Sequence, residues 1–303
     1  MLKVLRTPDE CFENLPGYDY EPHYTTITDY DGGEIRIHMI DEGPRDAEPI
    51  VLMHGNPTWS YIYRKMIPAL LATGRRVIAV DLVGCGRSDK PAHKRDYNLV
   101  RHVDWMSKWL LANDLNNITL FCQDWGGTIG LHLVANYSER FDRVIAANTG
   151  LPTGTGGNRW LTVWLLVMRY MRRFPWKMAF KPTIKTPDFT EAELSAYVDA
   201  PFPSKEYQAG ILQFPQLIAI HADNPGTPLN RVVWQKLKRF NKPFLTLFGD
   251  QDPVTKGKHR GLQKYIPGAK GQNHQIIAGG GHFIQEDKPE ELLKYIIPFL
   301  DVK

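Results

Sequence analysis

The sequence has no apolar run that could cross a membrane and no sign of an export signal. A membrane helix needs about 18 consecutive apolar residues, whereas the longest candidate, at 161–168, is shorter and soon meets Arg169. The N-terminal segment, 1–18, lacks the apolar core and small-residue cleavage site of a signal peptide. We therefore expect a cytoplasmic protein that does not associate with membranes.

Cysteine is also scarce, and metal-ligand spacing is absent. Cys11, Cys85 and Cys122 are the three cysteines, and no two of them form a CxxC pair. An odd number at wide spacing indicates reduced thiols, and Cys122 lies on a predicted buried strand. No histidine, cysteine and carboxylate cluster has the spacing of a metal site. The sequence predicts neither a metal nor another cofactor.

Strong charge imbalance is missing as well. The chain has 37 Lys and Arg against 33 Asp and Glu, a formal net charge of +4. The basic residues are scattered apart from small clusters at 169–173 and 256–260, which is weak evidence for anionic partners and gives no case for nucleic-acid binding. With 303 residues, 43% of them hydrophobic, the chain has the composition of a globular protein with a full core.

What the sequence does contain is a regular alternation of strand and helix patterns. The predicted strands are 23–30, 34–43, 49–55, 76–84, 117–124, 143–150, 243–250 and 273–280. The predicted helices between and after them are 59–73, 97–113, 127–140, 257–266 and 286–300. From residue 49 onward most strands are continuous apolar runs, which is typical of strands buried on both faces. We expect a mostly parallel eight-stranded sheet with helices on both faces and the strand C-terminal ends at one edge.

One region interrupts the alternation. No strand is predicted between 152 and 226, a stretch that begins in the glycine-rich loop 150–157. We interpret 152–226 as a helical cap inserted after the sixth strand, because an insertion there leaves the sheet intact. The main domain would then consist of 1–151 and 227–303.

The segment 118-ITLFCQDWGGTIGLHL-133 carries the first candidate for chemistry. Its apolar strand ends at Asp124, in a small–x–nucleophile–x–Gly pattern related to the GxSxG nucleophile elbow, with Cys122 at the small position. Such a turn points the side chain away from the sheet and leaves backbone N–H groups free at the helix start. Alone, the pattern also fits an ordinary helix cap.

Three other segments favour a catalytic interpretation. In 52-LMHGNPTWS-60 the loop around Asn56 follows the third strand, where α/β hydrolases supply an oxyanion-hole N–H. Asp250 and Asp252 follow the seventh strand, and we prefer Asp252 as the acid that orients a histidine. His282 follows the last strand. The order nucleophile, acid, histidine is that of the α/β hydrolases.

With these segments in place, the sequence resembles the haloalkane dehalogenases of the α/β-hydrolase superfamily over nearly its whole length. The similar stretches are HGNPTWSYIYRKM at 54–66, DLVGCGRSDKP at 81–91, QDWGG at 123–127, APFPS at 200–204 and GGGHFIQED at 279–287. The resemblance is closest to the subfamily whose acid follows strand seven.

The resemblance implies an α/β-hydrolase fold with a helical cap and particular roles for four residues. Asp124 would be the nucleophile, His282 the base, Asp252 the acid, and Trp125 a halide ligand. The substrate would be a small halogenated alkane, converted with water to an alcohol, a halide and a proton without metal or cofactor.

An aspartate nucleophile suits this reaction chemically. Ionised aspartate needs no base, and its attack on an sp³ carbon gives a stable alkyl ester. His282 would then activate water against that ester, while backbone N–H groups of Asn56 and Trp125 stabilise the oxyanion. Asp252 would fix the imidazole tautomer.

The second halide ligand is open at this stage. In the family it is a cap tryptophan or the asparagine of HGNP. Trp160 and Trp164 share one helix face with Val167. We prefer Trp164, which lies one turn inside the helix, with Trp160 and Asn56 as alternatives.

Two rival interpretations remain. An epoxide hydrolase has the same nucleophile but needs two cap tyrosines, for which Tyr170, Tyr197 and Tyr207 are candidates. A non-catalytic ligand-binding homologue, or an oxygenase of the coelenterazine-luciferase type, would share only the fold. Neither the preferred haloalkane nor the oligomeric state follows from the sequence.

Overall fold

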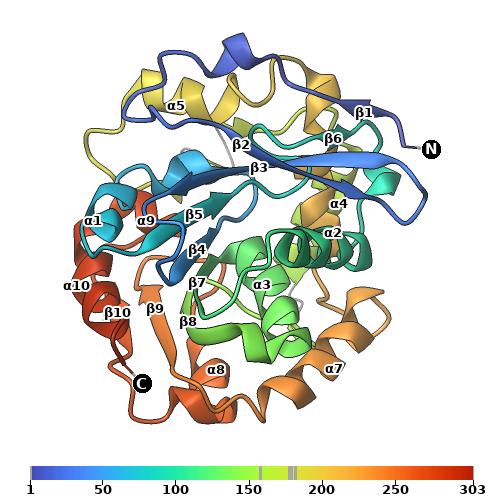
Figure 1. Ribbon diagram of the computed structural model, residues 1–303. Coiled ribbons are helices and arrows are strands. Elements are labelled where there is room, and N and C mark those ends of the chain that lie inside the picture. The colour runs from blue at the N-terminus through green and yellow to red at the C-terminus, as the bar shows by residue number, and fades with distance from the viewer. Residues whose placement is uncertain (1, 157–158, 177–179, 181–182, 303) are drawn as a thin grey trace.

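An eight-stranded sheet lies between two layers of helices in the computed structural model, which describes residues 2–156, 159–176, 180 and 183–302 (Figure 1). The strands are β2 (His23–Thr28), β3 (Glu34–Glu42), β4 (Pro49–Met53), β5 (Arg76–Val80), β7 (Ile118–Gln123), β8 (Phe141–Ala147), β9 (Phe244–Gly249) and β10 (Gln275–Ile277). Their spatial order is β10-β9-β8-β7-β4-β5-β3-β2, and β3 runs antiparallel to both of its neighbours while the other pairings are parallel. The predicted mostly parallel eight-stranded sheet is therefore confirmed.

The central strands follow directly from their composition. β4, β7 and β9 are buried along their whole length. Strands covered on both faces consist of continuous apolar runs, and such runs made these strands easy to predict from the sequence. An additional antiparallel pair, β1 (Val4–Leu5) with β6 (Lys90–Pro91), was not predicted, because two-residue strands carry no periodic signal.

The helices divide between the two faces of the sheet. Figure 1 shows α1 (Ile67–Leu71), α9 (Ile284–Asp287) and α10 (Pro289–Phe299) on one face, and α2 (Leu99–Ala112), α3 (Asp124–Asn136) and α7 (Gly226–Leu237) on the other. The remaining main-domain helix is α8 (His259–Tyr265). Helices on both faces of the sheet are what the strand–helix alternation predicted.

Two helix predictions were imprecise and one helix was missed. The helix expected at 59–73 is a short 3-10 helix, Ser60–Tyr63, followed by α1. The helix expected at 286–300 is broken at Lys288, because a residue before proline disfavours the α conformation and Pro289 follows. The helix α7 was not predicted at all, since its first turn contains Gly226 and Pro228.

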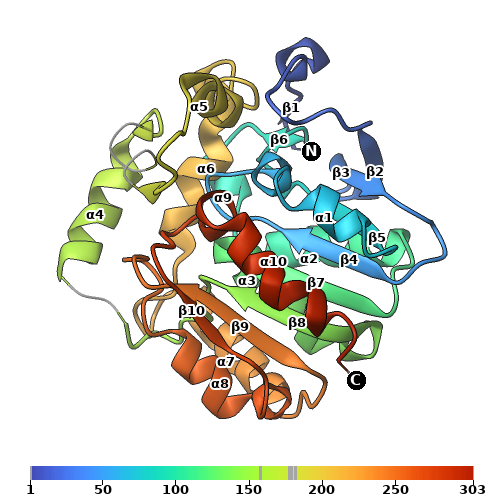
Figure 2. The same ribbon diagram turned by 90° about the vertical axis from the view of Figure 1, so that its left-hand side faces the viewer.

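The segment between β8 and α7 is helical. It contains α4 (Arg159–Tyr170), α5 (Glu191–Val198) and α6 (Ala209–Gln213), and an isolated bridge pairs Thr155 with His221 near its two ends. Figure 2 shows these helices beyond one end of the strands. The division into main domain and cap stays a prediction. In the described chain no helix combines the length and apolar character needed to span a membrane, and the cytoplasmic location stays a prediction too.

Candidate active site

Asp124 lies where β7 passes directly into α3. Its backbone φ is +51°, in the left-handed region that residues with a side chain adopt uncommonly, although aspartate does so more often than most. The helix begins at Asp124 itself, three residues earlier than the predicted start at 127. The strained turn is therefore part of the helix start and presents the carboxylate at the carboxyl end of the strand.

Two glycines that follow Asp124 make this turn possible. A Cβ on Gly126 would lie 2.2 Å from the carbonyl oxygen of Met53, and one on Gly127 would lie 2.0 Å from Oγ1 of Thr149. Both distances are far inside van der Waals contact. The beginning of α3 can thus pack against β4 and the loop after β8 only because these positions lack side chains.

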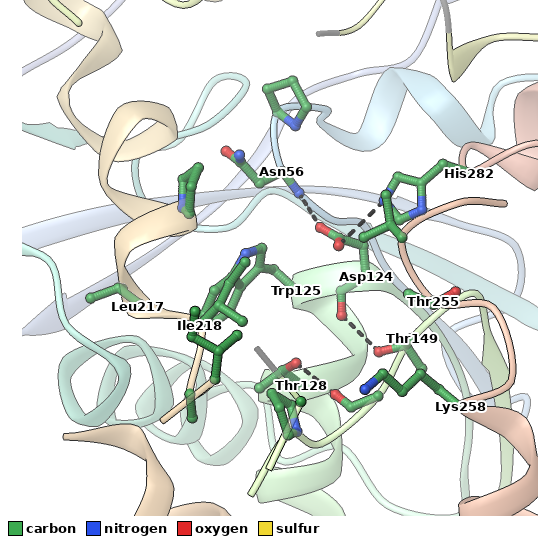
Figure 3. A pocket seen from close by; sticks show the side chains of 18 of the residues that line it. Asn56, Asp124, Trp125, Thr128, Thr149, Leu217, Ile218, Thr255, Lys258 and His282 are labelled. Atoms are coloured by element: carbon green, nitrogen blue, oxygen red, sulfur yellow. Dashed lines mark hydrogen bonds and ion pairs between the residues drawn. The ribbon is translucent and has the colours of Figure 1, made fainter. Parts of the chain in front are cut away.

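The structure brings Asp124, His282 and Asp252 together. His282 Nε2 lies 3.3 Å from Oδ2 of Asp124 (Figure 3), and its Nδ1 lies 3.0 Å from Oδ1 of Asp252. Asp250, the alternative acid, instead accepts the N–H of Gly279 at 2.8 Å. Of the two aspartates after β9, Asp252 is the one that contacts the imidazole.

Asp252 is held by its own loop. Its carboxylate accepts the N–H of Val254 at 2.8 Å, the N–H of Thr255 at 3.2 Å, and the hydroxyl of Thr255. Burial alone would raise the pKa of Asp252, but the nearby charge of His282 and these hydrogen bonds lower it. The carboxylate therefore stays ionised and fixed in place beside the imidazole.

The imidazole of His282 is strongly basic in this environment. Burial lowers its pKa, but the charges of Asp252 and Asp124 and the hydrogen bonds with them outweigh this effect and raise the pKa to about 10. The ring is consequently a cation between two carboxylates in the free protein. Loss of either negative charge would make the ring less basic.

The loop after β4 supplies a donor to Asp124. The N–H of Asn56 donates to Oδ1 of Asp124 at 2.9 Å. His54 fixes the loop, because its Nε2 accepts the N–H of Leu82 at 2.9 Å and its Nδ1–H therefore donates to the carbonyl of Gly55 at 2.8 Å. The N–H of Trp125 belongs to the first turn of α3, where amides have no partner within the helix.

Two supporting residues were missed from the sequence. Asn148 donates to the carbonyls of Gly281 and His282 at 2.7 and 3.0 Å, and it accepts the N–H of Gly249 at 2.8 Å. Gln123 donates to the same His282 carbonyl at 3.0 Å. Both amides are fully buried at strand ends. Because buried amides need hydrogen-bond partners, a polar side chain at the end of a buried strand is the signal that could have identified them.

Above the triad lies a largely apolar cavity of about 650 Å³. Asn56, Asp124, Trp125 and His282 form part of its wall (Figure 3). The apolar lining residues include Leu99, Phe174, Pro215, Leu217, Ile218, Ala219, Ile220, Val254 and Phe283. Such a wall suits a largely apolar substrate.

Two polar side chains in this wall are candidates for holding a halide. The Trp125 ring lines the cavity and packs against Phe214, with ring centroids 5.2 Å apart. The side chain of Asn56 also faces the cavity, on the same side of Asp124 as the indole (Figure 3). Trp160 and Trp164 belong to α4, but their side chains lie outside the described residues.

The candidate tyrosines do not meet in the cavity. Tyr170 is 77% exposed, and the hydroxyl of Tyr197 donates to Glu286 at 2.6 Å. Tyr207 is not among the described lining residues. Within the described part of the chain, no three histidine, cysteine or carboxylate groups gather as a metal would require.

Comparisons with known proteins agree with this geometry. The family model described as "alpha/beta hydrolase fold" matches residues 48–289. The haloalkane dehalogenase of Psychrobacter cryohalolentis is 50% identical, covering 99% of this chain and 98% of its own length, and that of Mycobacterium marinum is 45% identical, covering 98% and 99%. The solved structure of the tetrameric haloalkane dehalogenase DpaA from Paraglaciecola agarilytica superposes with a TM-score of 0.90 at 32% identity, covering 99% of this chain and all of that one.

Proposed function

The chain belongs to the haloalkane dehalogenases of the α/β-hydrolase family, enzymes that hydrolyse carbon–halide bonds, and we propose that Asp124 is the nucleophile of this reaction. The observation that carries the proposal is a carboxylate on a strained turn, between the N–H of Asn56 and the imidazole of His282, in the wall of an apolar cavity.

In the first step the carboxylate displaces the halide. Oδ1 of Asp124 accepts the Asn56 N–H at 2.9 Å, whereas Oδ2 has the longer contact, 3.3 Å to Nε2 of His282, and we take Oδ2 as the attacking oxygen. A bond forms between Oδ2 and the carbon, the carbon–halogen bond breaks, and the halide leaves with the electron pair. The product is an alkyl ester on Asp124, and no base takes part.

In the second step His282 activates water. Esterification removes the negative charge of Asp124, which is one of the causes that raise the pKa of His282. With only Asp252 beside it the imidazolium becomes more acidic and releases its proton to solvent, and the neutral ring then takes a proton from the attacking water. The hydroxide adds to the carboxyl carbon of the ester, and the N–H groups of Asn56 and Trp125 stabilise the oxyanion. The bond between this carbon and the alkoxy oxygen then breaks, the alcohol leaves with the proton held by His282, and the Asp124 carboxylate is regenerated.

The departing halide needs donors in an apolar place. The indole N–H of Trp125 is a donor with no acceptor function, and we propose it as the first ligand of the halide. Asn56 is our candidate for the second donor, because its side chain lines the cavity beside that indole. Trp164, which we preferred from the sequence, stays a prediction.

A bromide-release assay with 1-bromobutane and 1,2-dibromoethane, run beside a panel of epoxides, tests the proposal. We expect bromide from the haloalkanes and no diol from the epoxides, because none of the candidate tyrosines is among the described residues of the cavity wall. Asp124→Asn should abolish bromide release. Diol formation without bromide from any haloalkane would overturn the proposal and favour an epoxide hydrolase.

A further inference from the structure

The basic cluster at 256–260 has one member at the active-site cavity. Lys258 is part of the cavity wall, and its aliphatic stem packs on Gly150, where an added Cβ would lie 3.4 Å from Lys258 Cγ. Its Nζ would lie 3.5 Å from a Cβ on Gly156. Figure 3 shows Lys258 on the opposite side of Asp124 from Asn56, with the ammonium directed inwards.

Among the described residues of the wall, the Lys258 ammonium has no counter-ion. No carboxylate of the described residues lies within ion-pair distance of it, and among the described lining residues Asp124 is the only acidic one. The side chain is exposed, so its charge costs little to maintain. A cation placed between an apolar cavity and solvent is therefore available to an anion.

A second depression continues from this point. It encloses about 530 Å³ and shares Gly150, Pro152, Gly156 and Lys258 with the cavity. Arg231 and Lys238 also line it, and no aspartate or glutamate occurs among its described lining residues. We call this surface the basic groove. Three cations without a lining carboxylate produce a positive potential beside the cavity mouth.

We propose that the enzyme also dehalogenates haloalkanes with a carboxylate at the far end, the ω-haloalkanoates, and that Lys258 pairs with that carboxylate. This inference rests on the proposed function, because the halogen-bearing carbon must still reach Asp124. The alkyl chain would lie along the apolar wall, while the carboxylate stays at Lys258 and the basic groove attracts the anion from solution.

The chemistry requires no additional reactant. Asp124 displaces the terminal halide and forms an ester, and water then cleaves that ester. One haloalkanoate and one water give one hydroxyalkanoate, one halide and one proton. The carboxylate of the substrate does not change, so the pairing with Lys258 acts on binding and orientation alone.

The experiment compares 6-bromohexanoate, 8-bromooctanoate and 10-bromodecanoate with their methyl esters, which match them in length but carry no charge. Bromide release gives kcat/KM for each pair, and the ratio of acid to ester isolates the effect of the charge. We expect Lys258→Gln to lower this ratio about two- to fivefold, mainly through KM, as for an exposed ion pair. Lys258→Glu should lower it further, because attraction becomes repulsion.

Two controls make the comparison specific. Lys256→Gln removes a nearby exposed cation that lines neither space, and it should leave the ratio close to that of the wild type. Added salt at about 0.5 M should slow the acids but not the esters, because it screens exposed charges.

Each outcome decides the matter. Bromide from the esters but not from the acids would overturn this inference and leave the proposed function intact. The same would follow if the acid-to-ester ratio were equal in the wild type, Lys258→Gln and Lys258→Glu. No bromide from either series would overturn the proposed function, and the inference with it.

Discussion

At the scale of single residues, the central feature is an imidazole between two carboxylates. His282 contacts Asp124 through Nε2 and Asp252 through Nδ1, and its pKa is raised to about 10. In the alkyl-enzyme one of the two charges is gone, so the imidazole that activates water is less basic than the one in the free enzyme. The nucleophile thus adjusts its own base when it reacts.

This coupling predicts that acid affects the two steps differently. Lowering the pH protonates His282 in the alkyl-enzyme and stops hydrolysis, whereas alkylation needs no base. At about pH 5 we expect a burst of bromide in the first turnover followed by slow steady-state release, and at about pH 8 we expect faster steady-state release. Rapid-quench measurement of bromide would detect both phases. If acid slowed the first turnover as much as the steady state, so that no burst appeared at about pH 5, the proposed division of steps would be contradicted.

Halide binding gives a second test at this scale. Trp125→Phe keeps a ring against Phe214 but removes the indole N–H. We expect bromide to inhibit the variant about tenfold more weakly, because a hydrogen bond to an anion is lost. The inhibition constant of bromide measures this. An unchanged constant would show that Trp125 is not a halide ligand.

The same measurement decides between the candidates for the second donor. We expect Asn56→Ala to weaken bromide inhibition, since this side chain lies in the cavity wall beside Trp125. Trp164→Phe and Trp160→Phe are the matched variants for the cap tryptophans. Weaker inhibition in Trp164→Phe alone would favour the choice made from the sequence.

At the scale of elements, the junction of β7 with α3 determines where the nucleophile stands. Gly126 and Gly127 face backbone and side-chain atoms at distances that leave no room for a methyl group. We expect Gly126→Ala to lower both thermal stability and activity, because the carbonyl of Met53 cannot move without disturbing β4. Gly261→Ala on α8 is the control, since its nearest atom is 4.0 Å away and alanine favours a helix. Equal melting temperatures for Gly126→Ala and the wild type would contradict this account.

The helix α5 is connected to the segments around Arg64 and Glu286 by buried charges. Arg64 donates to Glu286 and to Glu193 of α5, Lys65 donates to Glu286, and Tyr197 of α5 donates to Glu286 as well. The side chain of Glu286 is 0% exposed and that of Arg64 4%. This network joins α5 to α9, the helix that follows His282.

We expect Glu286→Gln to lower the free energy of unfolding by about 3 kcal/mol, because it leaves Arg64 buried without its main partner. Urea denaturation measures the change. Glu291→Gln, which removes an exposed pair with Lys294, is the control and should alter the midpoint little. A similar small change in both variants would mean that the buried network contributes no more than a surface pair.

At the scale of the whole molecule, the parallel sheet brings Asn56, Asp124, Asp252 and His282 to one edge from four separate loops. The sequence predicted this well, because the strands of a buried parallel sheet are continuous apolar runs and the loops after them carry the chemistry. The order of the strands, with only β3 antiparallel, needed the structure.

What the sequence did not predict depends on contacts between distant residues. Asn148 reaches His282 across 134 positions, and no local pattern reveals such a bond. The helix α7 escaped detection because Gly226 and Pro228 occupy its first turn. The position of Lys258 in the cavity wall could not be predicted from the sequence either. A basic cluster in a sequence indicates only a charged surface.

The central claim is that Asp124 carries an alkyl ester between the two steps, and His282→Phe tests it most directly. With 1-bromobutane this variant should release one equivalent of bromide and gain the mass of one butyl group, because alkylation proceeds and hydrolysis does not. Peptide mapping by mass spectrometry should locate the butyl group on Asp124. Sustained turnover without an adduct, or an adduct on another residue, would contradict the account.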